Sequence, residues 1–270
     1  MLPLELLRPI ICYLYAEKDR SSLHALSLTS KILGSEGERL LYRDITLANE
    51  GLHDKFLTTI VASRHKALLV HSYSQDGPDF VGKRRLWNLL SQAFKIMHNL
   101  THLSIRPSLL TGAPEEIHQW GFQLRSLDCR GGLEIRQVVS DFLAAQPGLR
   151  RLGVDWASSS PTLMTSSMCP ALEMLRGNRA IIERLLPGRH ITSLAWIPHM
   201  DPSNPIDHLA PSLNHLRALS FGGSTSRLSL NLFVSHLQSL EVLKLVNASP
   251  EVSLSYLLRS PRSMALICRN

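Results

Sequence analysis

The chain has 270 residues, of which 44% are hydrophobic and 19% charged, a balance that is typical of folded domains and argues against disorder. Its net charge is +7, but the basic residues are scattered and the densest run is only Lys83-Arg84-Arg85, which argues against a nucleic-acid partner. No stretch of about 18 apolar residues occurs, so we expect no membrane span and no membrane partner. The four cysteines lack the short spacings of a metal site, and no secretory leader precedes them, so we expect a cytoplasmic or nuclear location.

The first 47 residues predict three short helices followed by a strand. Pro3 suits the first turn of a helix, where its missing N–H is not needed. One apolar stripe follows at i, i+3, i+4 and i+7: Leu7, Ile10, Ile11 and Leu14. Leu23 and Leu26 form an apolar pair on a second helix, which we expect to end at Gly34. Leu40 and Leu41 lie on a third helix, and Ile45 and Leu47 share one face of a strand. Helices this short bury little surface, so the module must lean on a neighbouring domain or a partner.

Four segments of this module resemble an F-box, and more narrowly the F-box-like heads of fungal F-box proteins: residues 2–6 (LPLEL), 10–11 (II), 26–31 (LSLTSK) and 40–43 (LLYR). Many F-boxes carry a Trp where this chain has Ile32. The resemblance implies that the head binds the Skp-type adaptor of a cullin–RING ubiquitin ligase. The residues that would form this contact are Leu2, Pro3, Leu4, Leu7, Ile10, Ile11, Leu26 and Leu28. Taken without the resemblance, the same helices could instead be a cap for the body that follows.

The body repeats an apolar-x-x-apolar-x-apolar frame. The first positions of the frame are 100, 124, 149, 172, 191, 216 and 240, with gaps of 24, 25, 23, 19, 25 and 24 residues. These gaps lie within the roughly 20–29 residues expected of leucine-rich repeats. One further step of 24 residues reaches Met264, followed by Ile267 at the second apolar position.

Helical patterns lie between the frames, over residues 86–97, 135–143, 181–186 and 254–258. Strand and helix in alternation predict an α/β fold with a parallel sheet on the concave side and helices on the convex side. Residues 48–99 are less regular, with a helix around 52–61, a strand over 67–73 and a loop over 74–79. We therefore expect an F-box-like module at 1–47, a linker with irregular first repeats at 48–99, and an irregular leucine-rich-repeat solenoid at 100–270.

The polar positions within each strand frame are expected to face the concave groove, because successive side chains of a strand point to opposite faces. The groove residues predicted in this way are His102, Arg106, Asp128, Arg130, Arg151, Asp155, Arg176 and Lys244. Arginines in neighbouring repeats could hold an acidic or phosphorylated segment, since the guanidinium group matches such anions. Ordinary solvation of the strand surface is the alternative explanation.

Catalytic and metal-binding patterns are lacking: the sequence contains no GxSxG, HExxH, Walker-type or GxGxxG motif. We therefore expect neither enzymatic activity nor a cofactor. The interpretation is a substrate-recruiting subunit of an SCF-type ubiquitin ligase, which binds the adaptor by its head and an unidentified protein substrate by its groove. One alternative is a leucine-rich-repeat scaffold whose first helices only cap the solenoid. Another is an enzyme or a nucleic-acid binder that uses the basic surface.

Overall fold

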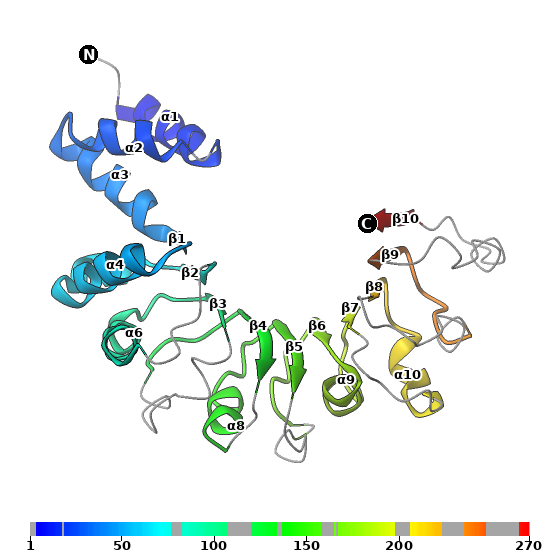
Figure 1. Ribbon diagram of the computed structural model, residues 1–270. Coiled ribbons are helices and arrows are strands. Elements are labelled where there is room, and N and C mark those ends of the chain that lie inside the picture. Colours follow the sequence, from blue (N-terminus) through cyan, green and yellow to red (C-terminus); the bar gives the residue numbers. More distant parts are fainter. Residues whose placement is uncertain are drawn as a thin grey trace. The chain divides into compact units, whose positions relative to one another are not determined.

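The computed structural model describes residues 4–17, 19–76, 83–106, 120–133, 137–157, 165, 167–197, 206–222, 235–246 and 265–269. The chain forms two compact units. Unit 1 contains residues 1–104 and 119–123, and unit 2 contains residues 105–118 and 124–270. Both are built from helices and parallel strands (Figure 1). The head therefore belongs to the same compact unit as the segment 48–99 that follows it.

The head consists of α1 (Leu4–Ala16), α2 (Arg20–Ser27) and α3 (Lys31–Arg43). Ser30 begins α3, because its side chain accepts a hydrogen bond from the backbone N–H of Leu33. The prediction that Gly34 ends the second helix is therefore wrong, since Gly34 lies inside α3. A Cβ on Gly34 would lie 3.0 Å from the carbonyl oxygen of Ser27, so this glycine permits close packing of α2 on α3.

The head has a small apolar core of its own. Ile11 of α1, Leu23 of α2 and Leu40 of α3 are buried against one another. Partly buried apolar side chains surround them: Leu14, Tyr15, Leu26, Leu33 and Leu41. Each of the three helices thus contributes one fully buried side chain, and this makes the head a packed module.

The remainder of unit 1 contains α4 (Glu50–Ala62), α5 (Arg64–Leu69), α6 (Arg84–Ile96) and the parallel strands β1 (Asp44–Leu47), β2 (Ser72–Gln75) and β3 (His102–Ile105). Ile45 and Leu47 are buried on one face of β1, as predicted. The strand predicted over 67–73 is wrong for its first half, because Ser63 caps α5 there and β2 begins only at Ser72. The loop predicted over 74–79 also begins too early, since Ser74 and Gln75 still belong to β2.

Aromatic side chains form a continuous series through the core of unit 1. Tyr73 lies between Phe56, at 6.0 Å between ring centroids, and Phe94, at 5.8 Å. Phe94 in turn contacts Trp120 edge-on at 4.8 Å and Phe122 at 5.7 Å. Edge-to-face pairs of this kind stabilise a core beyond their buried area. The segment around residue 120 therefore packs on unit 1, although most of the chain near it belongs to unit 2.

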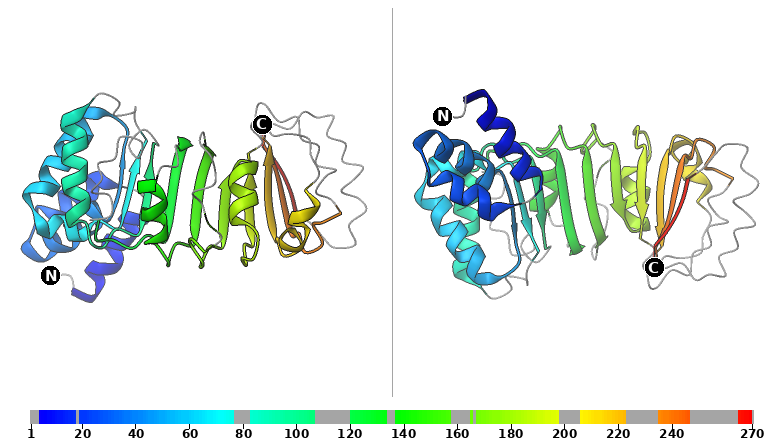
Figure 2. Two further views of the ribbon diagram at one scale, coloured as in Figure 1. Left: turned by 90° about the horizontal axis from the view of Figure 1, so that it is seen from below. Right: turned by 90° about the horizontal axis from the view of Figure 1, so that it is seen from above.

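Unit 2 is a series of parallel strands that lie side by side in chain order, as Figure 2 shows. The strands are β4 (Ser126–Leu133), β5 (Arg151–Ala157), β6 (Met174–Gly177), β7 (Ser193–Trp196), β8 (Ala218–Gly222), β9 (Val242–Val246) and β10 (Ala265–Arg269). Helices α8 (Gln137–Ala144), α9 (Arg179–Leu185) and α10 (Ala210–Leu213), the last preceded by the 3-10 turn η3 (Asp207–Leu209), lie on one side of them (Figure 1). This is the α/β, solenoid-like layout that the alternating pattern predicts.

The predicted apolar frame is buried in both units, at β3 of unit 1 and along the strands of unit 2. All seven first positions are buried, and so are the second positions: Leu103, Leu127, Leu152, Leu175, Leu194, Leu219 and Leu243. One backbone feature recurs at the start of β5, β6, β7, β8 and β9. The carbonyl of Arg150, just before β5, accepts hydrogen bonds from two consecutive N–H groups at β6, Glu173 and Met174. The carbonyls of Arg125, Glu173, Thr192 and Arg217 do the same at the strands that follow them.

The last strand shows a one-residue difference from the predicted frame. Leu266 of β10 pairs in register with Leu243 of β9, and Ile267 pairs with Lys244. A shift of one residue moves a side chain to the other face of a sheet. The prediction that Ile267 occupies the second apolar position is therefore wrong, and Leu266 occupies it.

Candidate interaction surfaces

The head carries a second apolar stripe on α1, separate from the stripe that enters its core. Leu6, Ile10 and Tyr13 are 50%, 42% and 65% exposed, respectively. Their spacing of i, i+4 and i+7 places them on one face of the helix. Single exposed apolar residues are ordinary, but an aligned row on one helix face is typical of a docking surface. We call these three residues the outer stripe.

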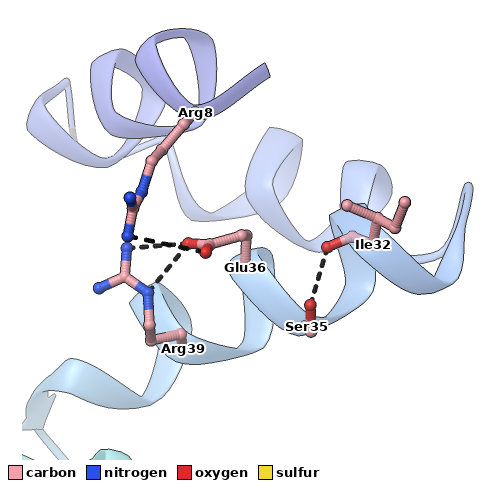
Figure 3. Close-up of polar contacts among 5 residues, drawn as sticks. All are labelled: Arg8, Ile32, Ser35, Glu36 and Arg39. Carbon is pink, nitrogen blue, oxygen red and sulfur yellow. Dashed lines mark hydrogen bonds and ion pairs between the residues drawn. The ribbon is translucent and has the colours of Figure 1, made fainter. Parts of the chain in front are cut away.

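Two further exposed apolar residues lie where α2 passes into α3. Leu28, at the end of α2, is 75% exposed, and Ile32, in the first turn of α3, is 56% exposed. Ile32 thus adds a second exposed apolar side chain close to Leu28 in the sequence. Figure 3 shows Ile32 on α3, where its carbonyl accepts a hydrogen bond from the Ser35 hydroxyl.

The predicted adaptor-binding residues divide between the outside and the core of the head. Leu28 and Ile10 are exposed, and Leu7 is partly buried. Ile11 is 2% exposed and Leu26 packs against the head core, so both stabilise the head itself. Leu2 and Pro3 lie outside the described residues, as does the side chain of Leu4. The single stripe predicted on the first helix therefore divides: Ile11 and Leu14 pack in the head core, Leu7 is partly buried, and Ile10 belongs to the outer stripe.

One ion pair joins α1 to α3 and shows which side of α1 faces α3. Glu36 of α3 accepts a hydrogen bond from the Nε of Arg39, 2.9 Å away, and its other carboxylate oxygen lies 3.9 Å from the guanidinium of Arg8 on α1 (Figure 3). Arg8 is two residues from both Leu6 and Ile10, which on a helix corresponds to nearly the opposite side. The contact between α1 and α3 therefore turns the outer stripe away from α3.

The second candidate surface is the face of the unit 2 sheet opposite α8, α9 and α10, which we call the open face (Figure 2). Strand register arranges its side chains in two rows. The first row is Ser126, Arg151, Met174, Ser193, Ala218 and Val242. The second row is Asp128, Gly153, Arg176, Ala195, Ser220 and Lys244. Met174 is 38% exposed and is the one large apolar side chain of these two rows that is solvent-exposed.

The structure brings two of the predicted groove residues together. A nitrogen of Arg176 lies 3.1 Å from the carboxylate of Asp128, although a whole strand separates β4 from β6. The residue between them in register is Gly153, whose missing side chain leaves room for the pair to meet above β5. The pair is half-buried, with 32% and 27% of the two side chains exposed. Arg176 is therefore neutralised within the chain, contrary to the expectation that it is available for an anionic partner.

The other predicted groove residues have different surroundings. Arg151 is exposed and Lys244 is half-buried, and both lie on the open face. Arg106 is exposed, just beyond β3. Arg130 and Asp155 lie on β4 and β5, with side chains outside the described part.

His102 lies on β3 in unit 1, on a sheet face that carries polar residues. It registers with Ser72, which registers in turn with Asp44. Its Nδ1 is 2.9 Å from the hydroxyl oxygen of Thr101. Burial raises the pKa of Asp44, and the nearby His102 and His71 partly lower it.

The densest basic run of the sequence is paired within unit 1. Lys83 lies 3.2 Å from Glu50, and Arg85 lies 3.1 Å from Asp54. The two acidic residues belong to α4, and the basic residues lie at the start of α6. This local concentration of positive charge is thereby largely balanced.

Two buried titratable side chains, His53 and Cys169, are neutral at physiological pH. Burial lowers the pKa of His53 to about 4, although its ring lies 2.8 Å from the Tyr73 hydroxyl. Burial likewise raises the pKa of the Cys169 thiol to about 11, far from that of an activated nucleophile. In the described parts of the chain, no three His, Cys, Asp or Glu side chains gather closely enough to hold a metal ion. Among the described helices, none has the length and apolar content needed to cross a membrane.

Some surface residues were not singled out by the sequence reasoning. Leu6 and Tyr13 complete the outer stripe, and their spacing with Ile10 was visible as a second helical period. The role of Gly153 in the Asp128–Arg176 pair depends on strand register, which no local sequence pattern shows.

A scan of the sequence against protein-family models finds no match, and a search of the curated proteins finds none.

Proposed function

We propose that this chain is a substrate-recruiting subunit of a cullin–RING ubiquitin ligase, with an F-box-like head and a leucine-rich-repeat body. The head would bind the Skp-type adaptor, and the open face would bind a protein substrate. The observation that carries the proposal is the outer stripe of Leu6, Ile10 and Tyr13 on a head that already has its own core. The F-box resemblance of the same segment supplies the identity of the partner.

The burial pattern favours docking over a simple capping role. A cap turns an apolar face toward the repeats, and Tyr42 of α3 makes such a contact with Phe56 of α4, whereas the outer stripe stays exposed. The outer stripe, with Leu28 and Ile32, leaves five large apolar side chains between 42% and 75% exposed. Burying such residues against a partner is the main favourable term in association.

The direct test is binding of the full chain to a purified Skp-type adaptor, measured by isothermal titration calorimetry. Replacing Ile10 and Tyr13 by Asp should weaken binding by about thirtyfold or more, because truncating central anchors costs about 2 kcal/mol or more. Cys12→Asp is the matched control, since Cys12 is exposed on the same helix but outside the outer stripe. Circular dichroism should show the same helix content for all three proteins.

Two outcomes would contradict the proposal. If the folded wild-type chain does not bind the adaptor, the head is a cap, and the chain is a repeat scaffold with another partner. If Cys12→Asp weakens binding as much as the double variant, the outer stripe is not the contact surface.

A further inference from the structure

We propose that the open face of unit 2 binds an extended segment of a partner protein with two acidic side chains about six residues apart. Arg151 would hold one carboxylate and Lys244 the other. The inference rests on the proposed function only in identifying this partner as the recruited substrate, because the surface belongs to unit 2 and the outer stripe to unit 1.

The open face has two positive charges that are not neutralised by described residues. Its second row contains Asp128 and Arg176, which neutralise each other at 3.1 Å. Arg151 and Lys244 remain, and neither forms an ion pair with any described residue. The described part of this face therefore has an excess of two positive charges, which complement an acidic partner.

The spacing of the two cations sets the length of the partner segment. Arg151 is on β5 and Lys244 on β9, so four strand-to-strand steps separate them. Neighbouring strands lie about 4.8 Å apart, and the two residues are also offset by one row, which gives a separation of about 20 Å. An extended chain advances about 3.3 Å per residue, so about six residues span the distance.

The floor between the two cations suits an extended backbone better than a helix. Its side chains are small and half-buried: Ser193, Ala195, Ala218 and Ser220. The hydroxyls of Ser193 and Ser220 have no hydrogen-bond partner among the described residues. An extended segment offers free N–H and C=O groups to such hydroxyls, whereas a helix has already paired its own. The exposed Met174, next to Arg151 in the first row, provides an apolar contact at one end.

The experiment is a selection of binders from a random peptide library, with peptides of about twelve residues, on the immobilised full chain without adaptor. We expect the selected peptides to carry Asp or Glu pairs about six residues apart, with small residues between them. The same selection on the variant Arg151→Glu/Lys244→Glu should lose this enrichment and favour Lys and Arg instead. Arg184→Glu, an exposed position on α9, is the matched control and should select the wild-type peptides.

Affinities of the best peptides, measured by fluorescence polarisation, should fall by about tenfold or more in the double variant and stay unchanged in the control. The inference is overturned if the wild type selects no peptides, if its peptides lack acidic pairs, or if the double variant selects the same ones. It is also overturned if sedimentation shows a wild-type dimer that the double variant loses, since a second copy would then occupy the face. The peptide selection contains no adaptor, so its outcome does not depend on whether the chain binds the adaptor.

Discussion

Gly153→Ala tests whether this glycine exists to let Asp128 and Arg176 meet above β5. The backbone of Gly153 does not have a positive φ, so alanine brings no backbone strain. Its Cβ would instead collide with the carboxylate of Asp128, which must then move away from Arg176. Losing a half-buried ion pair costs about 1 kcal/mol, while alanine in a strand stabilises by about 0.5 kcal/mol relative to glycine. We therefore expect a small net destabilisation in the wild-type background.

In a chain that already carries Asp128→Ala, the substitution Gly153→Ala should stabilise the fold instead of destabilising it. Without the carboxylate the new methyl group meets no oxygen, so Gly153→Ala should stabilise the chain by about 0.5 kcal/mol. The coupling free energy between the two sites should be about 1 kcal/mol, measured by urea denaturation of all four proteins. Gly148→Ala is the control, because no atom lies within 4 Å of its added Cβ, and its coupling to Asp128→Ala should be zero. Equal effects of Gly153→Ala in both backgrounds would refute the role assigned to this glycine.

Two further predictions concern one buried histidine and the glycine that ends β8. His53 has a pKa lowered from 6.5 to about 4 by burial, so the unfolded chain binds a proton more readily, and stability should fall from pH 6.5 to about 4 and level off below. The total loss of stability over this pH range is about 3 kcal/mol. His53→Gln should abolish this pH dependence of the unfolding free energy, measured by urea denaturation at each pH. An unchanged pH dependence in the variant would exclude His53 as its source. Gly222 has a φ of 132°, and a Cβ there would collide with the backbone of Val246. Gly222→Ala should therefore lower the free energy of unfolding, measured by heat or urea, by about 2 kcal/mol or more. An unchanged free energy of unfolding would show that β8 and β9 can move apart at this point without loss of stability.

Periodic features of this chain were readable from the sequence because they depend on local spacing. The apolar frame at Leu100, Leu124 and the positions that follow specifies which side chains enter the core, and all seven first positions are buried. Repeated strand and helix patterns likewise predicted an α/β layout with parallel strands. Boundaries were less well predicted where capping residues competed with glycine. Ser30 starts a helix through Gly34, and Ser63 starts one where a strand was expected.

The sequence by itself determined the repeat, the apolar frame and the F-box resemblance of the head, because each of these is a pattern of residue types at fixed intervals. Only the tertiary structure decided which apolar residues of α1 enter the head core and which stay outside, since both stripes have the same helical period. It also decided that Arg176 is paired with Asp128, while Arg151 and Lys244 form no ion pair with any residue that the structure describes. Side chains about 25 and 50 residues apart become neighbours only through strand register, and their charges then neutralise each other or remain available to a partner.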